Sequence, residues 1–317
     1  MITIVNCLHL SNGIGYTTQM FAKAWADLLT RCGVTVQLVC PDLDQSPKGK
    51  VSVKRPPGWS QWIVMHILHR WDRYEAHPLQ VDPCDKVLYF QMEQMGRPEW
   101  FPTVTDQYFK EIQTLSKKYF YWIDFARSNI SILRPLFLGL QFDRFVAIDP
   151  PCTFYDLAKI STTRRIQVGF CGHLNDRRNG IFQSVNQALA PLGITVETHY
   201  GWFTECQDKL LQTRIMLNVH FHDVEFKALE TVRIADAVSA GCFVISEETH
   251  PQDKRSWLAQ CAAISFVPTN ASFAEHVVSI VSNIDTLYGA QTQQDTVRAF
   301  QAASVQHCNK FLQFIAD

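Results

Sequence analysis

The chain has 317 residues, 47% of them hydrophobic, so it is long enough for two domains with packed cores, and global disorder is excluded. A formal net charge of −1 at pH 7 excludes a bulk attraction to nucleic acid or to an acidic membrane surface.

The cysteines and the start of the chain indicate a reducing compartment. Ten cysteines are widely spaced and form no CxxC pair, which predicts free thiols rather than a zinc site or a disulfide framework. The opening residues MITIVNCLHL lack the basic segment of a signal peptide, and no apolar run is long enough to span a bilayer. We therefore expect a cytoplasmic protein without membrane insertion.

The first elements form a strand–helix–strand unit. Apolar spacing predicts a strand, a helix and a strand at Thr3–Leu10, Gln19–Arg31 and Val34–Cys40. The loop before the helix carries Gly13 and Gly15, which let a backbone approach a ligand. Thr18 occupies the place of the third glycine of a dinucleotide fingerprint, so a tight turn explains the pattern as well as a binding loop does.

A polar segment with four cations follows Pro41. Its basic residues are Lys48, Lys50, Lys54 and Arg55. We expect a solvated loop or an edge hairpin here, and the alternative is a docking patch for an acidic acceptor. The tryptophan-rich stretch 59–71 is too irregular to place.

The remaining chain alternates strands and helices. Strands are predicted at Lys86–Gln94, Lys118–Ile123, Arg144–Ile148, Ile166–Cys171, Thr195–Thr198 and Ala263–Val267, and helices at Thr105–Ser116, 130–133, Ile181–Leu189, Gln207–Gln212, Phe273–Ile284 and Thr296–Phe314. Ser128 or Asn129 is expected to cap the second helix. A proline pair at 150–151 separates predicted domains 1–150 and 151–317. The pattern predicts an α/β fold of two facing, doubly wound Rossmann-like domains, with the last helix a candidate to pack back on the first domain.

The stretch 217–248 carries the strongest functional signal. It reads as a strand, the polar loop 223–227, a helix ended by Gly241 and a second strand. The loop of such a βαβ unit lies at the carboxyl end of a parallel sheet, where open α/β folds bind ligands. Arg233 and Asp236 share one face of the helix, and this pair suits a phosphorylated sugar nucleotide.

A second informative loop, GHLNDRRNG, spans Gly172–Gly180. Arg177 and Arg178 precede its helix, and arginine suits phosphate oxygens. Cations oppose the dipole at a helix start, so this placement calls for a compensating anion. We favour a phosphate there over an arginine pair that is merely solvated.

These motifs resemble the donor domain of GT-B glycosyltransferases of the group 1 or family 4 type, which carry G-R-L before a lysine and later E-A-M-A-x-G. Gly172 and Leu174 match that glycine and leucine, and His173 replaces the arginine. Arg178 stands at the lysine position and would bind the diphosphate. Asp236 stands at the second glutamate of the EX7E motif and would hold the donor ribose.

Ala228 occupies the place of the first glutamate of that motif, and Glu225 and Glu230 are the candidates to replace it. The resemblance implies a metal-independent enzyme that needs no cofactor and takes a nucleotide-diphosphate sugar as donor. The donor-binding residues expected are Gly172, His173, Asn175, Arg177, Arg178, Lys227, Glu230, Arg233 and Asp236.

A closer resemblance is to a GT-B-like branch found in bacteria and their viruses. Its members carry E-Q after a strand, an aromatic-D-x-x-x-x-N element, L-N-x-H before the donor helix, and VISE after it. Here these are Glu93 with Gln94, Trp122–Asn129, Leu217–His220 and Val244–Glu247. The resemblance covers nearly the whole chain but gives almost no information about the acceptor.

The catalytic candidates are Glu93, His9 and Asp124. Glu93 follows an apolar strand and is expected to point into the cleft between the domains, where burial would raise its pKa; the alternative is a carboxylate bonded to backbone N–H groups. His9 lies at a similar strand end. His220 and His222 share a strand face, and satisfied polar residues are favoured over a metal pair there.

The sequence thus predicts a glycosyltransferase whose acceptor is a glycan or a small molecule, with modified DNA as a less favoured acceptor. The acceptor-side residues expected are Gly13, Gly15, Gln94, Lys48, Lys50, Lys54 and Arg55. Two alternatives stay open: an NAD-dependent oxidoreductase, which rests on the G-x-G loop, and a GT-B-shaped binding protein without turnover.

Overall fold

A computed structural model of the chain describes residues 1–6, 13–39, 51–68, 79–82, 84–91, 120–136, 145–160, 163–199, 204–221 and 227–316. The chain divides into two compact units, Met1–Ile148 with Phe311–Asp317 and Asp149–Lys310. Each unit is built on its own parallel sheet.

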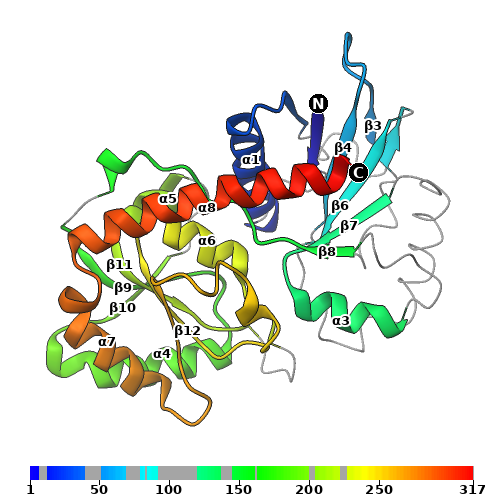
Figure 1. The fold of residues 1–317 in the computed structure, drawn as a ribbon. Coiled ribbons are helices and arrows are strands. Elements are labelled where there is room, and N and C mark those ends of the chain that lie inside the picture. The colour runs from blue at the N-terminus through cyan, green and yellow to red at the C-terminus, as the bar shows by residue number, and fades with distance from the viewer. Residues whose placement is uncertain are drawn as a thin grey trace. The chain divides into compact units, whose positions relative to one another are not determined.

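The first unit contains a six-stranded sheet in the order β2-β1-β4-β6-β7-β8, in which every pair of neighbours is parallel (Figure 1). Its strands are β1 (Ile2–Asn6), β2 (Val36–Val39), β4 (Ile63–Leu68), β6 (Lys86–Gln91), β7 (Phe120–Asp124) and β8 (Phe145–Ala147). The helices α1 (Gly13–Arg31) and α3 (Arg127–Leu136) follow β1 and β7. Trp25, Trp62 and Trp122 are among the largest fully buried side chains.

The expected loop before the first helix was wrong, because the helix α1 begins at Gly13, so Gly13 and Gly15 lie in its first turn. Of the polar segment, residues 42–50 lie outside the described ranges; its residues Val51–Val53 form β3, which pairs in parallel with β5 (Leu79–Val81), and Lys54 and Arg55 follow outside any helix or strand. The tryptophan-rich stretch, for which no element was predicted, contains β4, a central strand of the sheet.

The second unit contains a five-stranded parallel sheet in the order β10-β9-β11-β12-β13. Its strands are β9 (Ile166–Cys171), β10 (Val196–His199), β11 (Thr213–Asn218), β12 (Phe243–Ser246) and β13 (Ile264–Phe266). The helices α4 (Asp176–Leu189) and α7 (Phe273–Leu287) pack on one face, and α5 (Thr204–Gln212) and α6 (Thr231–Ser239) lie on the other (Figure 1).

The strand order of the second sheet reverses beside β9. The chain passes from β9 outward to β10 and then returns to β11 on the other side of β9. The carboxyl ends of β9 and β11 therefore form a topological switch point, the place where doubly wound sheets bind ligands.

The last helix, α8 (Ala290–Ala316), contributes to both units. Phe311 packs its ring 5.5 Å from Trp25 and Phe314 packs 5.4 Å from Tyr121, so the final turns belong to the core of the first unit. Among the described helices, none combines the length and the apolar character that a membrane crossing requires. The cysteines that the structure describes are free thiols.

Candidate functional site

The candidate site begins at Gly172, which follows the last residue of β9. Its φ of 148° favours glycine, and a Cβ there would lie 3.1 Å from the Phe170 ring and 3.2 Å from Arg233 Nη2. A glycine thus lets the backbone pass close to Arg233, which comes from α6 on the neighbouring strand connection.

Asn175 starts the helix α4. Its side chain accepts a hydrogen bond from Arg178 N at 2.9 Å, and its Nδ2 donates to Phe221 O at 2.6 Å. The cap joins the end of β9 to the segment after β11. Because α4 begins at Asp176, five residues before the predicted start at Ile181, Arg177 and Arg178 lie in its first turn.

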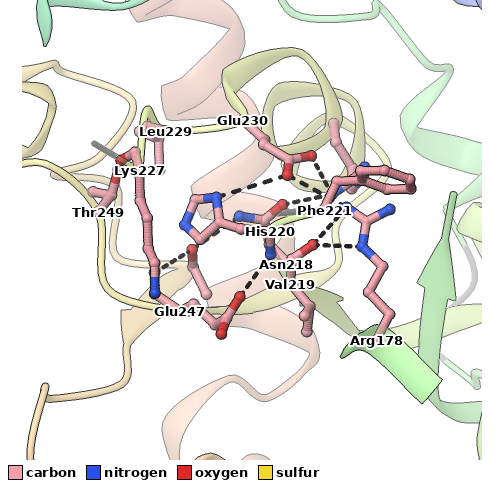
Figure 2. A network of polar contacts seen from close by, with 12 residues as sticks. Arg178, Asn218, Val219, His220, Phe221, Lys227, Leu229, Glu230, Glu247 and Thr249 are labelled. Carbon is pink, nitrogen blue, oxygen red and sulfur yellow. Dashed lines mark hydrogen bonds and ion pairs between the residues drawn. The ribbon is translucent and has the colours of Figure 1, made fainter. Parts of the chain in front are cut away.

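Arg178 is a buried cross-link, with only 2% of its side chain exposed. Its Nε and Nη2 donate to Val219 O at 3.0 and 2.6 Å (Figure 2). Its Nη1 donates to His173 O at 2.7 Å. Nη2 also lies 3.4 Å from Glu230 Oε1. Burial lowers the pKa of Arg178 to about 10, so the guanidinium stays charged at neutral pH.

Aromatic rings complete the surroundings of Arg178. Its Cζ lies 4.9 Å from the Phe170 ring centroid and 5.1 Å from that of Phe221. The guanidinium therefore ties the β9 and β11 loops together, and most of its donors are already used within the protein.

Arg177 pairs with Glu247, the residue that follows β12. Nη2 lies 2.5 Å from Oε1 and Nη1 lies 3.1 Å from Oε2, while Nη1 also donates to His220 O at 2.7 Å. Glu247 Oε2 accepts the backbone N–H of His220 at 2.6 Å. An internal carboxylate thus supplies the anion that the arginine pair was expected to require from a ligand.

Glu230 stands at the N-cap position of α6 and connects three cationic or titratable groups. It contacts Arg178 Nη2 and, at 3.7 Å, His220 Nδ1 (Figure 2). It also contacts Arg233 Nη1. Burial by itself raises the pKa of Glu230, but the charges of Arg233 and its other neighbours outweigh burial and lower this pKa. The carboxylate is therefore ionised, and it is 23% exposed.

Arg233 also reaches the end of β11. Its Nη1 donates to Asn218 Oδ1 at 2.9 Å, and Asn218 Nδ2 donates to Ser246 Oγ at 3.0 Å. Within the described ranges, Nε and Nη2 of Arg233 make no hydrogen bond to another residue, and 21% of the side chain is exposed. Arg233 therefore retains donors for a ligand.

His220 lies beyond the end of β11 and is 1% exposed. Burial lowers its pKa, so the imidazole is neutral at neutral pH despite the nearby carboxylate of Glu230. Its Nε2 lies 3.1 Å from Glu248 O. His220 was expected to lie within a strand, on the same face as His222. The strand β11 ends at Asn218, so His220 lies after it, and His222 lies outside the described residues.

Asp236 lies on α6 and is held by two hydroxyl groups. Thr153 Oγ1 and Tyr155 OH donate to its Oδ1 at 2.8 and 2.9 Å. Burial raises the pKa of Asp236, and the two hydroxyl donors oppose this shift. The proposed contact with a ribose stays a prediction.

The other expected donor residues lie at the rim of this network. His173 is exposed, and its ring centroid lies 5.9 Å from that of Phe221. Lys227 is half-buried, and its carbonyl oxygen accepts from Thr249 Oγ1 at 2.6 Å and from His250 N at 2.8 Å. Glu225 lies outside the described residues.

Asp124, a catalytic candidate, is fully buried at the end of β7. Its Oδ1 accepts from Ala126 N at 2.9 Å and from Asn129 Nδ2 at 2.8 Å. Ser128 and Asn129 lie inside the first turn of α3 rather than before it. These contacts order the turn into α3, and a catalytic role for Asp124 stays a prediction.

Several expectations fall on residues outside the described ranges: His9, Glu93, Gln94, Lys48 and Lys50. Of the basic segment, Lys54 and Arg55 are described, and both are exposed. The Arg55 guanidinium lies 5.9 Å from the Trp62 ring centroid.

Four residues that organise the site were not among the expected site residues: Asn218, Glu247, Thr153 and Tyr155. The first two lie within motifs that the resemblance singled out, L-N-x-H and VISE, so a signal existed for them. Thr153 and Tyr155 follow the proline pair, and nothing in their local pattern connects them with Asp236, which is more than 80 residues away in the chain.

Three arginines gather at the switch point of the second sheet, where Glu247 and Glu230 offset part of their positive charge. Arg177, Arg178 and Arg233 lie at or beside the starts of α4 and α6, where helix dipoles also favour anions. Among the described residues, no group of three His, Cys, Asp or Glu side chains is placed to hold a metal ion. The geometry suits a phosphorylated ligand.

Solved structures resemble the whole chain, whereas no protein-family model and no curated protein matches it. A glycosyltransferase from Rickettsia africae is 11% identical, with a TM-score of 0.55 over 100% of this chain and 98% of that chain. Anabaena HepE, in complex with UDP and glucose, is 12% identical, with a TM-score of 0.52 over 98% and 99%. An alpha-glucosyltransferase, in complex with UDP-glucose and DNA containing an abasic site, is 9% identical, with a TM-score of 0.50 over 100% and 98%.

At these identities the likeness establishes the fold. The two parallel sheets and the full-length coverage identify it as the GT-B fold, and the predicted fold class is thereby confirmed.

Proposed function

We propose that the protein is a glycosyltransferase that takes its sugar from a nucleotide-diphosphate sugar bound at the carboxyl edge of the second sheet. The observation that carries this proposal is the cluster of Arg177, Arg178 and Arg233 at the switch point between β9 and β11. A diphosphate brings the negative charge that such a cluster attracts, and guanidinium groups match phosphate oxygens in geometry.

We assign different roles in donor binding to Arg178, Arg233 and Asp236. Arg178 orders the loops after β9 and β11 by donating to the carbonyl oxygens of His173 and Val219. Only the N–H groups of Arg178 that these carbonyl oxygens do not use are proposed to contact the diphosphate. Arg233 retains donors at a partly exposed position and is the better placed cation for phosphate. Asp236 is proposed to accept from the ribose hydroxyl groups.

The structural neighbours support a donor of this class. HepE was solved with UDP and glucose, and the alpha-glucosyltransferase with UDP-glucose and DNA. Because these proteins share only the fold with this chain, the nature of its donor rests on the arginine cluster.

For the acceptor we propose a glycan or a small molecule. A net charge of −1 provides no general attraction to a polyanion. DNA is the second candidate, because the basic segment 48–55 carries four cations, of which Lys54 and Arg55 are exposed.

A thermal-shift panel tests the donor proposal. We expect UDP- or GDP-sugars to raise the melting temperature of the full chain and NAD to leave it unchanged. Stabilisation by NAD alone would favour the oxidoreductase alternative. Slow release of free sugar from the donor, still present after dialysis against a chelator, would support a metal-independent transferase; donor binding without any release would favour the binding protein.

A further inference from the structure

The N-terminus of α6 presents polar groups around the Glu230 carboxylate. Glu230 occupies the N-cap position, but its side chain makes no capping hydrogen bond with the described chain. It turns instead toward Arg178 and His220 (Figure 2) and pairs with Arg233. First-turn N–H groups of a helix lack partners within their own helix, and the helix dipole makes this end positive.

Two fully buried polar atoms at this helix start lack hydrogen-bond partners among the described residues. Nδ1 of His220 and Oγ1 of Thr231 bond to no described residue, although each side chain is only 1% exposed. Buried polar atoms are paired in the great majority of cases, so two orphans at one helix start indicate a missing partner. Because Nε2 of His220 faces the carbonyl oxygen of Glu248, Nε2 carries the proton of the neutral ring and Nδ1 is an acceptor. A phosphate would accept from the Thr231 hydroxyl, and its charge would favour the imidazolium form of His220, whose Nδ1–H it would then accept.

The Glu230 carboxylate does not form hydrogen bonds with all the polar groups around it. It has two oxygens, and its Oε1 approaches His220 Nδ1 only to 3.7 Å, which is too long for a hydrogen bond. Phosphate offers more acceptor oxygens and a larger charge than a carboxylate.

We propose that Glu230 is a resident anion in a phosphate subsite at the start of α6, and that the donor phosphate displaces its carboxylate to reach Arg233, His220 and Thr231. This inference rests on the proposed function, because it assigns the place of the donor phosphate. It gives Glu230 a role opposite to that of a sugar-binding glutamate: its charge competes with the ligand.

The direction in which Glu230→Gln changes the affinity for phosphate-containing ligands distinguishes these two roles. With Glu230→Gln the competing charge is lost while the size of the side chain is kept, so the affinity of the full chain for UDP, GDP or inorganic pyrophosphate should rise by about fivefold or more. Asp285→Asn, at the exposed ion pair with Arg214, removes the same charge far from the site and should leave the affinity unchanged.

Thr231→Val provides an independent test in a variant that is expected to fold. It removes a hydroxyl group that has no partner among the described residues, so the stability should be unchanged or higher, while the affinity for pyrophosphate should fall. Each affinity is measured by isothermal titration calorimetry, with thermal unfolding as the check on folding.

The outcomes are distinguishable. If the wild type binds UDP or GDP and Glu230→Gln binds it equally or more weakly, the displacement is overturned and the donor proposal stands. If Thr231→Val binds pyrophosphate as tightly as the wild type, the subsite is not at the start of α6. If neither wild type nor Glu230→Gln binds any of the three probes, both proposals are overturned.

Discussion

Glu247 meets Arg177 through both carboxylate oxygens, at 2.5 Å from Nη2 and 3.1 Å from Nη1. The pair joins the first turn of α4 to the end of β12 and neutralises a cation that the helix dipole alone would disfavour. Two arginines at a helix start are therefore compatible with a stable fold before any ligand binds.

Substituting Glu247 with Gln should lower the free energy of unfolding by about 1–3 kcal/mol, because the substitution removes a charge-assisted pair and weakens the acceptor for His220 N. Urea denaturation measures this change. The exposed pair of Arg214 with Asp285 is the matched control, and Asp285→Asn should cost at most about 1 kcal/mol. Equal losses in both variants would contradict a structural role for the Glu247 pair.

Replacing Arg178 with Met should lower the free energy of unfolding by about 3 kcal/mol or more, because the carbonyl groups of Val219 and His173 would lose their donors in a buried place. Nucleotide binding is also expected to be lost, partly because the loops after β9 and β11 would no longer be held together. Hydrogen exchange at the end of β9 distinguishes the two causes. Unchanged stability together with lost binding would show that Arg178 acts chiefly as a ligand.

The alternation of apolar runs and helical spacing made the second unit predictable. Strands such as β9 and β12 are short, mostly apolar runs, and the glycine after α6 takes a φ of 77° at Gly241, as a helix stop requires. The first unit was harder because β4 lies within a tryptophan-rich stretch without regular period. Its position in the sheet is fixed by tertiary contacts, such as the hydrogen bond from Trp62 Nε1 to Thr3 Oγ1 at 2.8 Å.

The candidate site was predictable in its residues and less so in their roles. Local sequence places Arg177, Arg178 and Arg233 near helix starts, but it does not show which carboxylate each one meets. Glu247 lies 70 residues from Arg177, and the parallel pairing of β9 with β11 and of β11 with β12 brings the segments after β9 and β12 to the same edge of the sheet. Long-range ion pairs of this kind follow from topology rather than from local pattern.

The stability of the first unit should fall as the pH is lowered from 6.5 to 5. Burial lowers the pKa of His66 from 6.5 to about 4, so in this range the unfolded chain binds a proton that the folded chain does not. The loss from this residue should be about 2 kcal/mol. His66→Leu should flatten the dependence by that amount in urea denaturation at several pH values. His199, His220 and His276 also have lowered pKa values, and they give the second unit a pH dependence of the same sign. A slope unchanged by His66→Leu would contradict the prediction.

If DNA is the acceptor, its binding should depend steeply on salt, because phosphate contacts release counterions. Changing Lys48, Lys50, Lys54 and Arg55 to Ser should weaken the binding of labelled duplex DNA at low salt and reduce the salt slope. Changing Lys86, whose Nζ contacts the carbonyl oxygen of Ile315, to Ser is the control: it removes one cation elsewhere on the chain. An absence of binding at low salt, or equal binding by wild type and the fourfold variant, excludes a DNA acceptor at this segment.

Asp236→Asn should separate ligand binding from folding. Because burial raises the pKa of Asp236 in the folded state, the ionised carboxylate is disfavoured there, and its contribution to stability is lost as the pH rises through this pKa. Asparagine keeps an oxygen for Thr153 and Tyr155 and carries no charge, so the stability at pH 7 should be unchanged or slightly higher. A ribose would lose its charged acceptor, and nucleoside diphosphate binding should weaken by about 1–2 kcal/mol. Calorimetric titration with UDP and GDP, beside urea denaturation, measures both quantities. Undiminished affinity in a stable Asp236→Asn protein would remove Asp236 from the donor site and leave it as an anchor for the segment after the proline pair.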